Sequence, residues 1–207
     1  MSLGSPAPLR YVALGDSYTI GTATRRASEH WPDQLVARLR SLAPALELVA
    51  NLGANGFTSR DVIEVELPEL PSLEPGFVTV LVGVNDVVQG VPEATYRENV
   101  TIILDELLSR LPPSRLLVVT TPDYTVTPRG GDFGDQTQQA GEIRRFNGAI
   151  AELASQRGIG VVEIHVLSLD AATDRSLVAD DGLHPSGAQY ARWVDRIAPV
   201  VEDLLRR

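Results

Sequence analysis

The chain contains no cysteine, and its 18 basic residues are all arginine, so lysine is absent too. Without thiols it has no disulfide, no thiolate metal site and no cysteine nucleophile. Without lysine it cannot form a Schiff base, and it lacks the lysine on which P-loop nucleotide sites depend. These two absences remove whole classes of enzyme before any motif is considered.

Positive charge and long apolar runs are scarce as well. The formal net charge is -9 and the sequence pI is about 4.8. Broad binding to nucleic acid or to anionic lipid needs a basic face, so neither is expected. No apolar run approaches the roughly 18 residues of a membrane-spanning helix, and the N-terminus shows no signal-peptide pattern. We therefore expect a cytoplasmic protein without membrane insertion, with residues 1–8 as a flexible or vector-derived start.

What is present is a regular alternation of apolar runs and helical patterns over 207 residues. Five short runs rich in β-branched residues are typical of strands buried on both faces, at 10–14, 47–52, 77–83, 115–121 and 159–166. Helical patterns cover 31–42, 58–67, 96–111, 138–158 and 186–207. This alternation predicts an α/β protein with a single domain over residues 1–207. Its parallel sheet of about five strands lies inside a three-layer α/β/α sandwich.

Polar and glycine-rich segments follow the predicted strands. GDS (15–17) follows the first strand, NLGANG (51–56) the second and GVND (83–86) the third, while DGLHP (181–185) comes after the fifth. A parallel sheet delivers such segments to one edge. That edge would gather a serine, a glycine turn, an asparagine, an aspartate and a histidine, which are the groups that acyl transfer needs.

Each of these groups has a chemical role in such a reaction. Ser17 can act as a nucleophile if a base takes its proton, and His184 can be that base because imidazole titrates near neutral pH. Asp181, three residues earlier, can reach the ring and hold one tautomer, with Asp180 as a competitor. A glycine N–H, the Asn85 amide and the Ser17 N–H can stabilise the oxyanion.

The four segments also resemble, in order, the motifs of the SGNH hydrolases, the GDSL-type esterases and lipases. The resemblance implies a nucleophile at Ser17, an oxyanion-hole asparagine at Asn85 and a catalytic pair at Asp181 and His184. It also implies an oxyanion glycine at Gly56, with Gly53 as the alternative. Tyr18 departs from the pattern, because many members have leucine there. The family fold is flavodoxin-like, in agreement with the predicted layout.

The other candidate residues have structural interpretations. Asp16 and Asp86 are expected to stabilise turns, His30 to lie on the surface or a pocket rim, and His165 to be partly buried at the end of the fifth strand. No metal-ligand spacing is present, so neither a metal nor a cofactor is expected. The loop 122–137 is positioned to shape a pocket, and the loop aromatics that could line it are Phe57, Tyr124 and Phe133.

These observations predict a serine hydrolase, a small esterase that cleaves carboxylic esters of short acyl groups through an acyl-enzyme. Its partner would be a small-molecule ester. A carbohydrate O-acetyl esterase or a thioesterase of the same family is an alternative. From another class, a flavodoxin-like module could bind phosphate at GDSYTIG (15–21), but GVND and DGLHP would then have no task.

Overall fold

The strands form one parallel sheet in the order β2-β1-β3-β4-β5, in a computed structural model that describes residues 7–206. Every neighbouring pair is parallel. The strands are β1 (Leu9–Gly15), β2 (Leu46–Asn51), β3 (Phe77–Leu81), β4 (Leu116–Val119) and β5 (Gly160–Val162). The central strands are buried on both faces because most of their side chains are apolar, as at Val12, Ala13 and Leu14.

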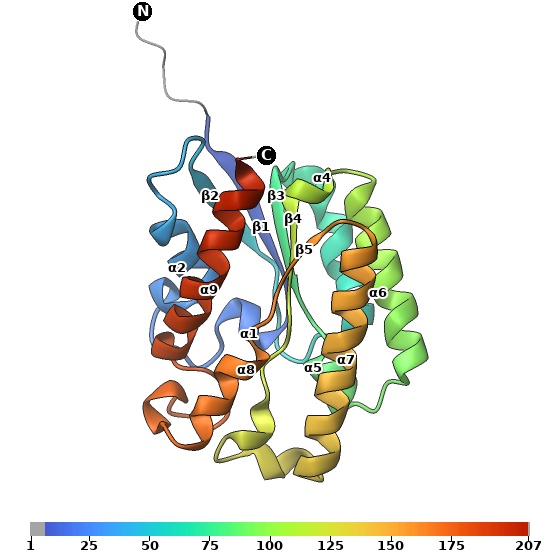
Figure 1. The fold of residues 1–207 in the computed structure, drawn as a ribbon, viewed down its shortest axis with the longest axis vertical. Helices are drawn as coiled ribbons and strands as arrows, with labels where there is room; N and C mark the ends of the chain where they lie inside the picture. Colours follow the sequence, from blue (N-terminus) through green and yellow to red (C-terminus); the bar gives the residue numbers. More distant parts are fainter. Residues whose placement is uncertain (1–6, 207) are drawn as a thin grey trace, which may run out of the picture.

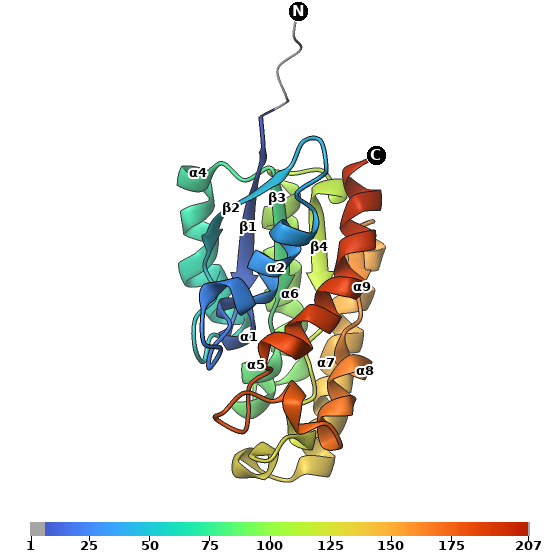
Figure 2. The same cartoon turned by 90° about the vertical axis from the view of Figure 1, so that its left-hand side faces the viewer.

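Helices cover both faces of the sheet, which confirms the predicted three-layer α/β/α class. On one face α2 (Trp31–Arg38) packs against α9 (Gly187–Leu205), and on the other α6 (Glu93–Leu108) packs against α7 (Gln136–Gln156). Figure 1 shows the sheet between these two pairs, and Figure 2 shows α2 and α9 in front of it. Within residues 7–206, no helix is long and apolar enough to span a membrane.

Shorter helices fill the connections. The short α-helices are α1 (Ser17–Ile20), α3 (Ser59–Asp61), α4 (Leu70–Leu73), α5 (Val84–Val88) and α8 (His165–Ser168). A π-helix, η2 (Val62–Glu66), follows α3 directly. The 3₁₀ turns are η1 (Ala27–Glu29), η3 (Leu67–Glu69), η4 (Pro113–Arg115), η5 (Tyr124–Val126), η6 (Gly130–Phe133), η7 (Leu169–Ala172) and η8 (Arg175–Leu177).

Two local expectations were wrong. The single helix expected over 58–67 is a succession of α, π and 3₁₀ turns that continues to α4. Pro68 and Pro71 lack an N–H, so a regular α-helical ladder cannot continue through them. The fifth strand stops at Val162, because the next N–H to bond the sheet, that of Ile164, donates to the Thr120 hydroxyl. His165 therefore begins α8 and does not end a strand.

The expected start over residues 1–8 falls mostly outside the described residues, which begin at 7. Residues 7 and 8 are exposed and have no secondary structure.

The order of the strands determines where a ligand can bind. From β1 the chain moves to β2 on one side and then to β3 on the other, so the direction of winding changes between β1 and β3. In open α/β sheets ligands bind beyond the carboxyl ends of the strands at such a switch point. Gly15 at the end of β1 pairs with Leu81 at the end of β3, so α1 and α5 begin side by side there.

Gly15 allows that close approach. Its φ is +148°, and a Cβ at this position would collide with the Leu81 carbonyl oxygen and lie 2.5 Å from Thr19 Oγ1. We expect Gly15→Ala to lower the free energy of unfolding by about 2 to 4 kcal/mol in urea denaturation. Gly148→Ala, inside α7 and facing open space, is the matched control and should stabilise by about 0.5 to 1 kcal/mol. Small, equal effects of the two changes would contradict this steric role.

Candidate active site

Ser17 is the first residue of α1, directly after β1. Asp16 is the N-cap, and its Oδ1 accepts the Tyr18 N–H at 2.9 Å. Asp16 is fully buried, and burial raises the pKa of its carboxyl to about 8. The Asx-type turn expected at Asp16 is therefore present, and it fixes the residue that follows it.

His184 and Asp181 lie in one turn near the sheet edge. The His184 Nδ1 is 2.6 Å from Asp181 Oδ2, while Asp181 Oδ1 accepts the N–H groups of Leu183 at 2.9 Å and His184 at 3.0 Å. Partial burial alone would raise the pKa of Asp181, but these hydrogen bonds hold it below its usual value. The carboxylate is therefore ionised at neutral pH and can accept a hydrogen from His184 Nδ1.

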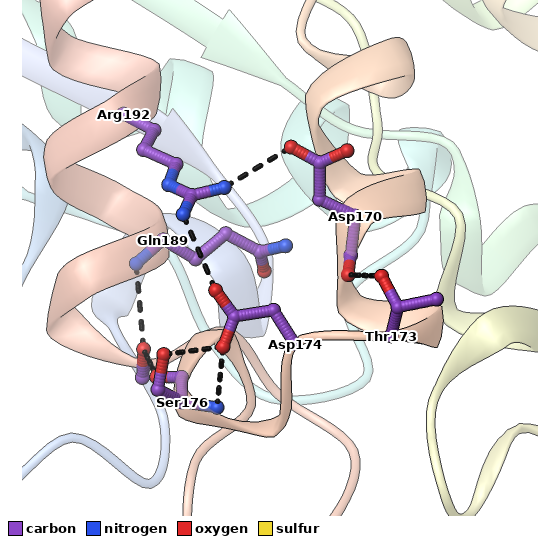
Figure 3. Close-up of polar contacts among 7 residues, drawn as sticks. Asp170, Thr173, Asp174, Ser176, Gln189 and Arg192 are labelled. Atoms are coloured by element: carbon purple, nitrogen blue, oxygen red, sulfur yellow. Dashed lines mark hydrogen bonds and ion pairs between the residues drawn. The ribbon is translucent and has the colours of Figure 1, made fainter.

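The segment that carries Asp181 and His184 is a hairpin held together by backbone hydrogen bonds. Val178 and Pro185 form an antiparallel bridge, and the Ala179 N–H donates to the His184 carbonyl at 2.8 Å. In the segment before the hairpin, Asp170 and Asp174 contact Arg192 of α9 at 3.0 Å and 3.3 Å (Figure 3). These contacts connect the segment that leads into the hairpin to α9.

Asn85 is the second residue of α5, directly after β3. Its Nδ2 donates one hydrogen to the Phe57 carbonyl at 2.8 Å, which orients the amide and leaves its second hydrogen free to meet a ligand. The loop after β2 is thereby held close to the end of β3.

The two candidate glycines of that loop differ in their surroundings. Gly53 is buried beneath the serine turn, where a Cβ would lie 2.7 Å from the Asp16 carbonyl oxygen, and its N–H donates to Asn51 Oδ1 at 3.3 Å. Gly56 is exposed with a φ of +79°, next to the Phe57 carbonyl that holds Asn85. Among the described residues, no acceptor bonds the N–H of Gly56 or of Ser17.

Ser17, Asn85 and His184 line one pocket of about 60 Å³. Its remaining lining is mostly apolar and consists of Tyr18, Val84, Val88, Tyr124, Phe133 and Leu183. Tyr124 and Phe133 pack edge to face with ring centroids 5.5 Å apart. The loop 122–137 thus contributes to the pocket wall, as expected, whereas Phe57 does not line this pocket.

Tyr18 is a pocket residue that the sequence analysis treated only as a departure from a pattern. Its buried ring lies 5.8 Å from the His184 ring and 6.4 Å from the Trp193 ring, both in edge arrangements. It therefore supports the face of the imidazole. In the sequence, the available signals for the pocket lining were the position of Tyr18 directly after Ser17 and the apolar residues next to Asn85 and His184.

The other histidines and the competing aspartate lie elsewhere. Asp180 is exposed and pairs with Arg25 at 3.2 Å. His30 faces Asp33 at 3.6 Å, and His165 is buried at the start of α8. None of the three lines the pocket. Within residues 7–206, no group of three or more histidine, cysteine or acidic side chains could hold a metal ion.

Asp86, next to Asn85, is fully buried and anchors the start of α3. It accepts the Ser59 N–H at 2.9 Å and the Ser59 hydroxyl at 2.5 Å, and Asn99 donates to that same hydroxyl. Burial raises the pKa of Asp86, although the hydrogen bonds from Ser59 act in the opposite direction. This network joins α5 to α3 beneath the candidate site.

Comparisons with known proteins show the family and the fold. A sequence model of the GDSL-like lipase/acylhydrolase family matches residues 13–192. No curated protein sequence matches the chain.

Two solved structures illustrate the similarity of fold. An alpha/beta hydrolase enzyme from the metagenome of Lake Arreo, Spain, has a TM-score of 0.75 at 19% identity, covering 96% of this chain and 97% of that chain. An acetylxylan esterase from Geobacillus stearothermophilus has a TM-score of 0.74 at 16% identity, covering 96% of both chains.

The buried network at Asp86 can be tested by its effect on stability. We expect Asp86→Ala to lower the free energy of unfolding by about 3 kcal/mol, because the Ser59 N–H and hydroxyl lose their buried acceptor. Asp195→Ala is the matched control, since Asp195 is an exposed α9 residue 3.9 Å from Arg38. Its effect should stay within about 0.5 kcal/mol. Urea denaturation measures both, and a similar small loss in both variants would count against the network.

Proposed function

Because the chain belongs to the GDSL-like lipase/acylhydrolase family and is thereby a carboxylic ester hydrolase, we propose that it cleaves esters of short acyl groups with Ser17, His184 and Asp181. One observation carries the proposal. Ser17, Asn85 and His184 line one small pocket, and Asp181 is hydrogen-bonded to Nδ1 of His184. These are the groups that acyl transfer requires as nucleophile, oxyanion donor, base and orienting carboxylate, and their position around one pocket supports the proposal.

In the first half of the reaction, Ser17 Oγ attacks the acyl carbonyl carbon while its proton passes to His184 Nε2. Asp181 stabilises the imidazolium that forms, because its carboxylate accepts the Nδ1 hydrogen. The C–O bond of the ester then breaks, and the alcohol leaves with the proton from Nε2. In the second half, water gives its proton to His184 and attacks the acyl-enzyme, which releases the acid and restores the Ser17 hydroxyl.

The oxyanion of each tetrahedral intermediate needs aimed donors. The Ser17 N–H at the start of α1 and the free hydrogen of Asn85 Nδ2 are two candidates. Gly56 is the third, because its N–H is unbonded to the described residues, whereas the Gly53 N–H is already used by Asn51. We therefore assign Ser17, Asn85 and Gly56 to the oxyanion hole, and we assign Gly53 to packing against the serine turn.

The size of the pocket favours a short acyl group. Its volume of about 60 Å³ holds only a few water-sized groups. The aromatic rings of Tyr124 and Phe133 pack against each other and line it. An acetyl ester fits such a space better than an octanoyl ester. Acetylated carbohydrates are the alternative substrate class, since an acetylxylan esterase shares the fold and its acyl group is equally small.

The nucleophile can be tested with p-nitrophenyl acetate, butyrate and octanoate together with fluorophosphonate labelling. We expect Ser17→Ala to lose several powers of ten in kcat and all labelling, because a triad acts as a unit. Ser72→Ala, at an exposed serine of α4, is the matched control and should behave like the wild type. The proposal would be refuted by a folded wild-type protein that does not hydrolyse these esters, does not hydrolyse acetylated xylose and does not react with fluorophosphonate.

The acyl preference can be tested at Phe133. Phe133→Ala should enlarge the pocket, raising kcat/KM for the octanoate relative to the acetate by about tenfold or more. Phe133→Leu, which keeps most of the volume, should give an intermediate ratio. Steady-state kinetics over the ester series measure this shift. An unchanged ratio in Phe133→Ala would remove Phe133 from the acyl pocket while leaving the Ser17 assignment intact.

A further inference from the structure

The end of β1 has no strand partner on its β2 side. Pairing with β2 ends at Ala13 and Asn51, and the Leu52 N–H makes one last bond to the Ala13 carbonyl. Gly15, two residues further along β1, is fully buried and directly precedes the serine turn. A buried N–H without an acceptor costs free energy comparable to a lost hydrogen bond. Some other group must therefore accept the Gly15 N–H.

That acceptor is a carboxyl group from outside the four motifs. The Gly15 N–H lies 2.9 Å from Glu66 Oε2 and 3.3 Å from Glu66 Oε1. Glu66 is only 1% exposed, although Glu64 and Val65 on the same helix face solvent. A carboxyl group is costly to bury unless it is hydrogen-bonded, and its backbone partner here is Gly15.

The irregular helix η2 brings this carboxyl inward. Glu66 is the last residue of the π-helical turn Val62–Glu66, and η2 packs against both β1 and α6. A π turn inserts an extra residue and rotates the side chains that follow, and such turns occur frequently at functional sites. The irregular helix thus places one carboxyl group at the end of β1.

The surroundings of Glu66 favour its neutral form. Burial is the largest influence on Glu66; together with the nearby carboxyls of Asp16 and Asp61, and against the hydrogen bond from Gly15, it raises the pKa of Glu66 to about 9. Glu66 is therefore protonated at neutral pH and accepts the Gly15 N–H as an uncharged group. Such a group can hold the turn without placing a negative charge behind a developing oxyanion, which would oppose it.

We propose that Glu66 is a positioning residue for the nucleophile: by holding the Gly15 N–H, it fixes the peptide from which Asp16 and Ser17 continue. This proposal rests on the proposed role of Ser17. Glu66 acts through the backbone and does not contact the substrate. Glutamine, the uncharged isostere, should preserve the positioning role of Glu66, since its side-chain carbonyl can accept the same N–H. An apolar side chain of similar length should lose this role, because it leaves the Gly15 N–H without an acceptor.

Four variants test this proposal: Glu66→Gln, Glu66→Met, the shortened Glu66→Asp, and the exposed control Glu64→Met. With p-nitrophenyl acetate, we expect Glu66→Met to lose about 10- to 100-fold in kcat with little change in KM, because a small displacement of the nucleophile has a large effect. The rate of fluorophosphonate labelling should fall by the same factor. Glu66→Gln and Glu64→Met should stay close to the wild type, and Glu66→Asp should be intermediate.

Two further measurements separate positioning from general stability. Leu70→Ala removes a buried side chain of α4, which contacts β1 at Arg10 near its start and not at Gly15, and it should lower Tm while leaving kcat close to the wild type. Hydrogen exchange of the Gly15 amide, followed by NMR, should be faster in Glu66→Met than in Glu66→Gln. The amide readout does not depend on catalysis.

The outcomes are distinguishable. Wild-type kcat in Glu66→Met, an equal loss in Glu66→Gln, or an equal loss in Leu70→Ala would each overturn the positioning role. Unchanged Gly15 exchange in Glu66→Met would do so as well. If the proposed function itself fails, the wild type will resist labelling and turnover, and the Gly15 exchange rate alone will then decide whether Glu66 holds the turn.

Discussion

The parallel pairing of β1 with β3 is the constraint on which the rest of the site depends. Its register places Gly15 opposite Leu81, so the segments that follow the two strands begin next to each other. A residue with a Cβ cannot occupy the end of β1 at this separation, because it would meet the Leu81 carbonyl. Ser17 and Asn85, 68 residues apart in the sequence, face one pocket as a direct result.

The same edge of the sheet carries an unusual number of buried carboxyl groups. Asp16, Asp86 and Glu66 are all essentially inaccessible to solvent, and burial raises the pKa of each. Each accepts at least one backbone N–H from a turn that leads into or borders the site. Burying these carboxyl groups is energetically unfavourable, and it occurs here where they fix the backbone geometry. Such locally unfavourable features are typical of functional sites.

Much of this arrangement could be predicted from the sequence. Short, nearly continuous apolar runs indicated all five strands, because their length and their content of β-branched residues favour a strand over a buried helix. The motifs at the strand ends identified Ser17, Asn85 and His184 because a parallel sheet brings those ends together.

What escaped prediction depends on the backbone and on tertiary packing. The π turn at residues 62–66 has no periodicity of its own, so Glu66 looked like one more polar residue of an amphipathic helix. Tyr124 and Phe133 could not be separated from Phe57, because only the fold of loop 122–137 decides which ring reaches the pocket. Gly53 and Gly56 differ in burial, in backbone conformation and in the Asn51 acceptor that only Gly53 has, and no local pattern specifies these differences.

The wall of the pocket and the candidate base are also physically connected. Loop 122–137, which contributes Tyr124 and Phe133, donates the Arg129 N–H to the Gly182 carbonyl at 3.0 Å. Gly182 lies in the turn between Asp181 and His184, and its positive φ brings its Cα side against Pro128 and Arg129. Selection of the acyl group and orientation of the candidate base therefore depend on two neighbouring loops that this hydrogen bond joins.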